Sequence, residues 1–418
     1  MDFFRFLMSD VLSEPAVLVG LIALIGLIAQ KKPVTECIKG TVKTIMGFVI
    51  LGAGAGLVVS SLGDFANIFQ HAFGIQGVVP NNEAIVSVAQ KSFGKEMAMI
   101  MFFAMVINII IARFTPWKFI FLTGHHTLFM SMMVAVILAT AGMTGITLIA
   151  VGSLVVGVAM VFFPAIAHPY MKKVTGSDDV AIGHFSTLSY VLAGFIGSKF
   201  GNKEHSTEDM NVPKSLLFLR DTPVAISFTM SIIFLVTCLF AGADAVKELS
   251  GGKNWFMFSI MQSITFAAGV YIILQGVRMV IAEIVPAFKG ISDKLVPNAR
   301  PALDCPVVFP YAPNAVLVGF LSSFAAGLIG MFTLYLLNMI VIIPGVVPHF
   351  FVGAAAGVFG NATGGRRGAI LGAFAQGLLI TFLPVFLLPV LGDIGFANTT
   401  FSDADFGALG ILLGIIVR

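Results

Sequence analysis

Three histidines and one aspartate stand in apolar surroundings, where polar side chains are costly. His125 and His126 follow Gly124 at the start of an apolar stretch, His184 follows Gly183, and Asp304 lies in the Pro-broken segment ARPALDCPVVFPYAPN. Such groups inside apolar membrane segments usually serve function. Imidazoles can donate hydrogen bonds to a polar or anionic ligand, and a carboxylate can accept them from ligand hydroxyls. The residues therefore predict a binding site for a small polar molecule.

Other roles for these residues stay open. Asp304 can instead pair with Arg300 or cap the helix that follows it, and a lone histidine is often only a structural hydrogen-bonding group. His125, His184 and Asp304 could also be metal ligands of a membrane-embedded enzyme, although their spacing is generic. A proton-coupled symporter would use Asp304 or His125 as a proton relay. We expect His168 and His205, in polar segments, to be solvated.

The composition determines the class of protein. Of 418 residues, 58% are hydrophobic and 11% are charged, and the mean hydropathy is +0.99; soluble domains carry about 25% charged residues. A membrane-spanning helix needs about 20 apolar residues. The sequence therefore predicts an all-α polytopic membrane protein, and it excludes a soluble enzyme with one anchor. A net charge of +3 gives no indication of nucleic-acid binding.

Apolar runs and the charges between them predict about eleven transmembrane helices. These lie near 15–30, 44–61, 97–112, 119–141, 146–167, 223–242, 255–277, 314–343, 349–360, 369–391 and 405–417. Most Lys and Arg residues fall on one side, which the positive-inside rule makes cytoplasmic. The N-terminus is then outside and the C-terminus cytoplasmic. The last run is too short to cross, so we expect the chain to be truncated at its C-terminus.

Interrupted apolar segments recur in both halves of the chain. Segments 74–89 and 310–318 place proline and asparagine before an apolar stretch, and segments 122–130 and 347–353 place a histidine just after Gly or Pro. Half-helices at matching places are typical of inverted repeats in secondary transporters. We expect a first five-helix repeat in 1–222, a linker helix in 223–254 and a second repeat in 255–418. Segment 180–200 should be an amphipathic or re-entrant helix at the cytoplasmic surface.

Several catalytic and redox motifs are missing from the sequence. Cys37, Cys238 and Cys305 are isolated and indicate neither a disulfide framework nor a zinc site. No HExxH, GxSxG or P-loop pattern occurs. The glycines of GAGAG at 52–56 lie inside an expected span, where small residues favour close helix packing. These observations disfavour a membrane protease, a hydrolase and an ATP-driven pump.

Several long motifs together resemble a known family. KGTVKTIMGFVILGAGAG, FLTGHHTLF, SDDVAIGHFS, ILQGVRMVIAEIVPAFKGIS, ALDCPVVFPYAPNAVLVGF and PGVVPHFF occur in the order found in the ascorbate-specific enzyme IIC, or permease, of the bacterial phosphotransferase system. The resemblance implies an inner-membrane homodimer whose V-motif and core domains are each built from both repeats. It further implies elevator-like transport of L-ascorbate to a cytoplasmic IIB partner, itself served by IIA, that phosphorylates the substrate. It implies no cofactor, no metal and no catalytic or phosphorylated residue in this chain.

The resemblance also assigns substrate-binding residues. These are Asn82, Glu83, His125, His126, Thr127, Leu128, Phe129, His184, Phe185 and Asp304. Ascorbate is a monoanion at neutral pH, which suits the histidines and the half-helix N-termini, while Asp304 suits its hydroxyls. The family pattern has glutamine where this chain has Gly52, Phe129 and Phe185. Another sugar acid, or a polyol such as galactitol, therefore stays open as the substrate.

Overall fold

The computed structural model describes residues 15–74, 77–210, 215, 218–219, 221–396 and 398–417. Helices account for most of this part of the chain. The α-helices are α2 (Pro15–Ala29), α3 (Val34–Phe73), α4 (Asn82–Phe114), α5 (Gly124–Thr140), α6 (Gly145–Thr175), α7 (Thr187–Phe200), α8 (Thr222–Ala241), α9 (Ala243–Leu249), α10 (Trp255–Leu295), α11 (Pro313–Leu336), α12 (Val346–Leu387) and α13 (Ala404–Val417). The 3-10 segments are η2 (Thr207–Asp209), η4 (Cys305–Tyr311) and η5 (Leu388–Phe396).

Seven helices among the described residues are long and apolar enough to cross a membrane. They are Val34–Phe73, Asn82–Phe114, Gly145–Thr175, Pro223–Ala241, Trp255–Ile273, Pro313–Leu336 and Val346–Asp393. The chain is therefore a polytopic helical membrane protein. Several expected spans are parts of longer helices: 44–61 lies within α3, 349–360 lies within α12, and 369–391 runs from α12 into η5. The expected spans 119–141 and 405–417 correspond to the shorter apolar helices α5 and α13.

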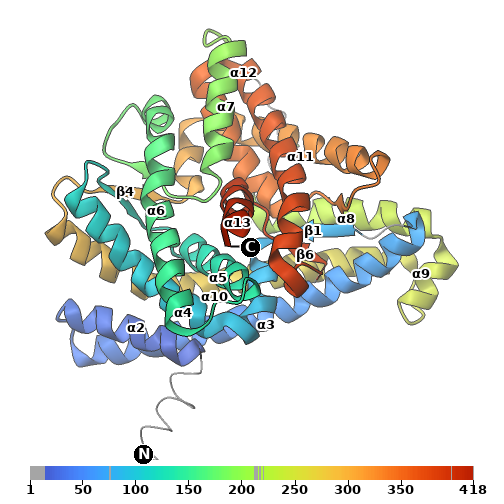
Figure 1. Cartoon of the computed structure of the whole chain (residues 1–418). Coiled ribbons are helices and arrows are strands. Elements are labelled where there is room, and N and C mark those ends of the chain that lie inside the picture. The colour runs from blue at the N-terminus through green and yellow to red at the C-terminus, as the bar shows by residue number, and fades with distance from the viewer. Residues whose placement is uncertain are drawn as a thin grey trace, which may run out of the picture.

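Helix α12 is interrupted by a glycine pair between the two expected spans 349–360 and 369–391. Gly364 and Gly365 have non-helical backbone angles, and Gly365 has φ of +61°. A Cβ on Gly365 would lie 2.2 Å from the carbonyl oxygen of Asn202. The 202–205 loop bonds directly to the break, since the Asn202 N–H donates to the Gly364 carbonyl at 2.8 Å. The break divides α12 into two segments that fold back against each other (Figure 1), since a Cβ on Gly360 would lie 2.3 Å from the Gly368 carbonyl oxygen.

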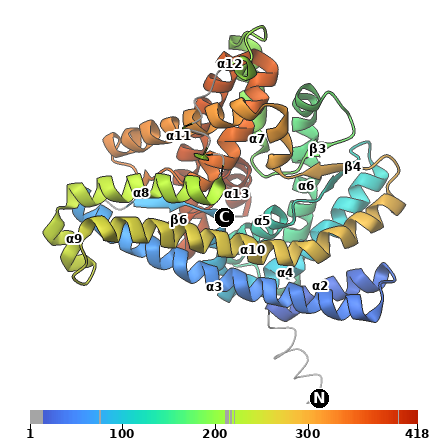
Figure 2. The same cartoon turned by 180° about the vertical axis from the view of Figure 1, so that it is seen from behind.

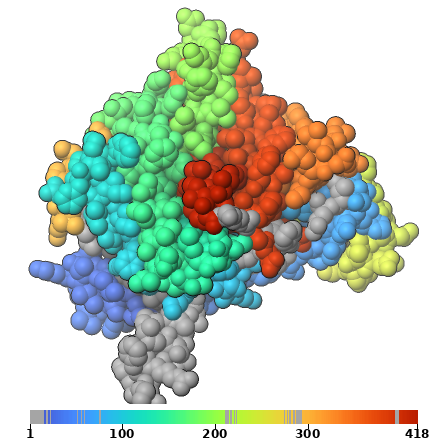
Figure 3. Space-filling view, viewed as in Figure 1, coloured from blue at the N-terminus to red at the C-terminus, as the bar shows by residue number. Residues whose placement is uncertain are grey.

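The helices form two bundles. In the first, here called the scaffold bundle, α10 packs along α3, with α2, α8 and α9 against them (Figure 2). In the second, the site bundle, α4 packs on α5 and α6, and α12 packs on α7 and α11. Helix α13 completes this bundle and lies between the α5–α6 region and α12 on the face seen in Figure 3. Contacts of α3 and α10 with α4, and of α10 with α5, join the two bundles.

Two small parallel sheets link the halves of the chain. The first has the order β5 (Val341–Ile342), β1 (Gly77–Pro80), β6 (Thr399–Thr400) and the second β2 (Phe119–Phe121), β4 (Arg300–Leu303), β3 (Ala181–Ile182). In each sheet the central strand comes from one half of the chain and both outer strands from the other. The pairing register is similar in the two sheets. The first two residues of β1 pair with β5 and its last two with β6. The first three residues of β4 pair with β2 and its last two with β3.

An ion cluster fixes the segment between α6 and β3. The Asp178 carboxylate lies 2.6 Å from Lys172 Nζ, 2.6 Å from His168 Nε2 and 2.6 Å from an Arg300 guanidinium nitrogen. Lys172 and then His168 hold the pKa of Asp178 well below its usual range. The expectation that His168 is solvated is wrong, because α6 extends to Thr175 and buries the ring; His205 is exposed as expected. Arg300 pairs with Asp178 and is not the ion-pair partner of Asp304.

Segment 180–200 comprises two elements. Strand β3 pairs with β4, and α7 follows it and packs along α12. Thr187, Ser189 and Tyr190 are buried on α7, whereas Phe195 and Phe200 are exposed. His184 lies in the short connection between the strand and the helix. The expected helix therefore begins later than predicted, and the residues before it are placed by a sheet.

Candidate functional site

One cavity of about 220 Å³ collects the residues that follow all six strands. Each strand leads directly into a helix or 3-10 segment, and the first turn after each strand contributes to the lining. The contributions are Asn82 and Glu83 after β1, His125 and His126 after β2, His184 after β3, Asp304, Cys305 and Pro306 after β4, Val347 and Pro348 after β5, and Ser402 and Asp403 after β6. Phe129, Phe351, Val352 and Arg278 complete the described lining. The two sheets thus place six helix starts around a single site.

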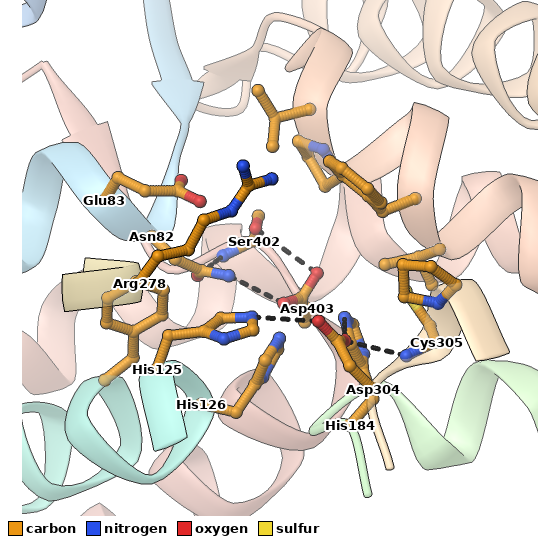
Figure 4. Close-up of a pocket in the computed structure, with 16 residues that line it drawn as sticks. Asn82, Glu83, His125, His126, His184, Arg278, Asp304, Cys305, Ser402 and Asp403 are labelled. Atoms are coloured by element: carbon orange, nitrogen blue, oxygen red, sulfur yellow. Dashed lines mark hydrogen bonds and ion pairs between the residues drawn. The ribbon is translucent and has the colours of Figure 1, made fainter. Parts of the chain in front are cut away.

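Asp304 lies between two histidines from different strand ends (Figure 4). Its Oδ2 is 3.5 Å from His125 Nε2 and its Oδ1 is 3.8 Å from His184 Nε2. Oδ1 also accepts the backbone N–H of Cys305 at 2.7 Å, so Asp304 caps η4. The two roles considered for Asp304, helix cap and site carboxylate, are therefore compatible. Its side chain is 37% exposed, against 5% for His184, so it can still accept a ligand hydrogen bond.

Hydrogen bonds on their far nitrogens orient the buried imidazoles. His126 Nδ1 accepts the Phe185 backbone N–H at 3.2 Å. A neutral His126 therefore carries its proton on Nε2. The Tyr190 hydroxyl lies 2.9 Å from His184 Nδ1 and donates to it when His184 Nε2–H faces the Asp304 carboxylate. The His126 and His184 rings are 3.8 Å apart, so the site presents adjacent N–H donors.

Asp403 and Ser402 are site residues that the sequence reasoning missed. Asn82 Nδ2 donates to Asp403 Oδ2 at 2.6 Å, and the Ser402 N–H donates to Asn82 Oδ1 at 2.9 Å. Both residues are buried. The available signal was FSDAD at 401–405, where two aspartates precede the last apolar run. Strand β6, which places these residues at the site, is only two residues long and pairs with a segment more than 300 residues away in the sequence.

Asp405 anchors the helix that follows His184. Its carboxylate accepts the backbone N–H of Thr187 at 2.8 Å and that of Leu188 at 2.8 Å, and its own N–H donates to the Phe185 carbonyl at 3.1 Å. Asp405 is fully buried. Since Thr187 and Leu188 form the first turn of α7, a residue of α13 supplies the cap that α7 lacks locally. Asp405 is a positioning residue for the His184–Phe185 segment.

The ten expected binding residues divide into two groups. Seven line the cavity: Asn82, Glu83, His125, His126, Phe129, His184 and Asp304. Thr127, Leu128 and Phe185 do not line it and are fully buried. Phe185 instead stacks on Phe121 at 4.6 Å between ring centroids and also contacts Phe163 and Phe406. Gly52 is absent from the cavity lining as well.

The helix starts favour a negatively charged ligand. Among the described residues, no side chain caps the first turn of α5, after Thr123, or that of α12, after Gly345. Their first backbone N–H groups carry the partial positive charge of a helix N-terminus. His126, His184 and Asp403 also place one potential ligand atom each within 4.8 Å of one another, a donor set that a metal ion could use. Asn82 already occupies one oxygen of Asp403 in such a set.

A second cavity of about 380 Å³ adjoins the first. Its lining comprises Leu122, Thr123, His125, Leu303, Asp304, Pro306 and Val307. His125, Asp304 and Pro306 line both cavities. These residues therefore form part of the wall between the two spaces.

Comparison with known proteins identifies the family. The model of the PTS system sugar-specific permease component family, EIIC-GAT, matches residues 10–405. The chain is also similar to the ascorbate-specific PTS system EIIC component of Mycoplasma pneumoniae, at 28% identity over 459 aligned residues that cover 96% of this chain and 67% of the relative. The chain belongs to the sugar-specific permease components of the phosphotransferase system.

Proposed function

We propose that this permease component binds L-ascorbate and transfers it across the inner membrane to a cytoplasmic IIB partner. The observation that carries the proposal is the placement of Asp304 between His125 and His184, at 3.5 and 3.8 Å. Imidazole N–H groups and uncapped helix starts suit the enolate of ascorbate, and the carboxylate suits its hydroxyls. The similarity to an ascorbate-specific EIIC component supports the same substrate.

The proposed architecture is a pair of inverted repeats, 1–222 and 255–418, joined by a linker in 223–254. Strand exchange supports it, because exchanging β1 with β4, β2 with β5 and β3 with β6 converts one sheet order into the other. We assign the scaffold bundle to the V-motif domain of a homodimer and the site bundle to a core domain that moves like an elevator. The six-junction cavity lies almost wholly in the site bundle, which supports transport of the site as a unit. Eleven crossings would leave the N-terminus outside and the C-terminus cytoplasmic.

Uptake measurements test the proposal. Membrane vesicles that hold the full-length chain should accumulate labelled ascorbate only when the cytoplasmic phosphotransfer partners and a phosphoryl donor are inside. His125→Ala and Asp304→Ala should both lose uptake. Arg113→Gln, on the exposed end of α4, serves as a control that should transport normally. Uptake that ignores the partners and follows a pH gradient would instead indicate a symporter.

Two further measurements separate the remaining alternatives. Unlabelled galactitol, or a sugar acid other than ascorbate, should compete poorly with labelled ascorbate for uptake. If one of them competes better than unlabelled ascorbate does, the substrate is reassigned and the permease function is kept. Metal analysis of the purified protein tests the ligand set His126, His184 and Asp403. A stoichiometric metal that is required for binding would contradict a site made of hydrogen bonds alone.

A further inference from the structure

Arg278 differs in origin from every other described residue of the cavity. The remaining lining residues follow a strand directly or lie one turn further along the same helix. Arg278 lies on α10, which packs chiefly against α3 and α8 in the scaffold bundle. Of the described lining residues, Arg278 is thus the one from the scaffold bundle, and the others belong to the strand-to-helix junctions of the site bundle.

Arg278 also differs in charge. Of the described residues that line the cavity, it is the one lysine or arginine, and it faces the carboxyl groups of Glu83, Asp304 and Asp403. Glu83 and Asp403 are buried, whereas Arg278 is exposed. Figure 4 shows its guanidinium on the Glu83 and Ser402 side of the cavity, across from His184. Among the described residues, none lies within ion-pair distance of it.

We propose that Arg278 is the counter-ion of the bound substrate anion and that the anion thereby links α10 to the site bundle. The inference rests on the proposed function, because it assumes an anionic substrate in this cavity. Three carboxyl groups line the cavity beside the histidines and helix starts, and a fixed positive charge there offsets any repulsion between a carboxylate and a bound anion. A guanidinium presents paired N–H donors that match two neighbouring oxygens, as an enolate and its adjacent hydroxyl offer.

The position of Arg278 gives the contact a consequence for transport. If the site bundle moves against the scaffold bundle, its six junctions move together, while Arg278 stays with α10. In the position described here the bound anion would link the two bundles through Arg278. After the site bundle has moved, the anion would no longer contact Arg278. Arg278 thus selects for a negative charge on the substrate in the state described here.

Equilibrium binding to the purified full-length protein tests the inference. The ligands are L-ascorbate and the neutral L-galactono-1,4-lactone, and the variants are Arg278→Gln, Arg278→Lys and the control Arg113→Gln. Loss of a charge-assisted contact should weaken ascorbate binding by about tenfold or more in Arg278→Gln. Arg278→Lys should recover part of that loss, and lactone binding should change less than about twofold, because the lactone has no charge to pair. The fall of ascorbate affinity with added salt should also become shallower in Arg278→Gln.

The opposing results are distinct. Equal weakening for both ligands, unchanged ascorbate binding, or an unaltered salt dependence would overturn the role of Arg278 as a counter-ion. A double variant tests whether Arg278 merely neutralises Glu83. If adding Glu83→Gln to Arg278→Gln restores ascorbate binding, the guanidinium acts on Glu83 and the inference fails. Absence of ascorbate binding by the unmodified protein overturns the proposed function itself. This outcome is distinct from the ones above, because they are differences between the variants and an unmodified protein that binds ascorbate.

Discussion

His125 Nε2 lies 3.5 Å from Asp304 Oδ2, and the two residues form part of the wall between two cavities. One cavity, of about 220 Å³, holds the remaining polar site residues. The other, of about 380 Å³, is lined mainly by Leu122, Leu303, Pro306 and Val307. The pair joins β2 of one half of the chain to β4 of the other at the ends where both strands lead into helices. A ligand that hydrogen-bonds to either residue therefore contacts the wall that separates the two cavities.

Asp304→Asn should separate the two roles of Asp304. Asparagine is as good an N-cap as aspartate, so the hydrogen bond from the Cys305 N–H should persist and the melting temperature should stay near that of the unmodified protein. The carboxylate that faces His125 and His184 is lost, and we expect ascorbate affinity to fall by about tenfold or more. Calorimetric binding and thermal unfolding in the same detergent measure both effects. Full affinity in the asparagine variant would show that the charge of Asp304 does not serve the ligand.

Asp405→Ala should weaken both stability and binding. The change removes the acceptor of two buried N–H groups at the start of α7 and should cost about 2 kcal/mol or more. Because the same turn carries the backbone that follows His184, ascorbate affinity should fall as well. Asp221→Ala is a matched control, since Asp221 caps α8 through the Val224 N–H on an exposed surface. The control should lower stability without lowering affinity; a loss of affinity of similar size in both variants would contradict a positioning role for Asp405.

Phe129→Gln and Phe185→Gln should behave in opposite ways. Phe129 lines the cavity, so a glutamine there can reach a ligand with its amide, and we expect ascorbate affinity to be kept or raised. Phe185 is fully buried among Phe121, Phe163 and Phe406, where an amide would lack hydrogen-bond partners. Burying it should cost about 2 kcal/mol or more. Ligand binding and thermal unfolding of both variants provide the comparison, and a stable Phe185→Gln protein with improved binding would show that the side chain can turn into the site.

The sequence allowed the class, the family and seven of the sixteen described cavity residues to be predicted. The sequence placed asparagines before the apolar stretch of α4, and the structure shows that Asn81 is the cap, since its side chain accepts the Ala84 N–H at 2.8 Å. Asp403 and Arg278 were missed for a physical reason: their roles depend on which strands pair and which bundle supplies α10. Phe185 was misplaced because adjacent residues after a strand point in different directions, so His184 can face the cavity while its neighbour packs in the core. Local pattern identifies a helix start, whereas strand pairing between distant segments determines which starts meet.

Gly357→Ala should disturb the site from a distance. A Cβ on Gly357 would lie 2.4 Å from the Ala315 carbonyl oxygen and 2.7 Å from the Gly319 Cα, so α12 would have to move away from α11. Overpacking of this kind costs about 1–3 kcal/mol. Because the first turn of α12 places Val347 and Pro348 in the cavity wall, we expect lower ascorbate affinity together with a lower melting temperature. Gly63→Ala on α3 is the matched control, since no neighbour in the described part of the chain lies within 4 Å of its Cβ position. Alanine there should leave binding unchanged and stabilise the helix by up to about 1 kcal/mol. Normal stability and binding in Gly357→Ala would mean that the close approach of α11 and α12 is not what places the start of α12 at the site.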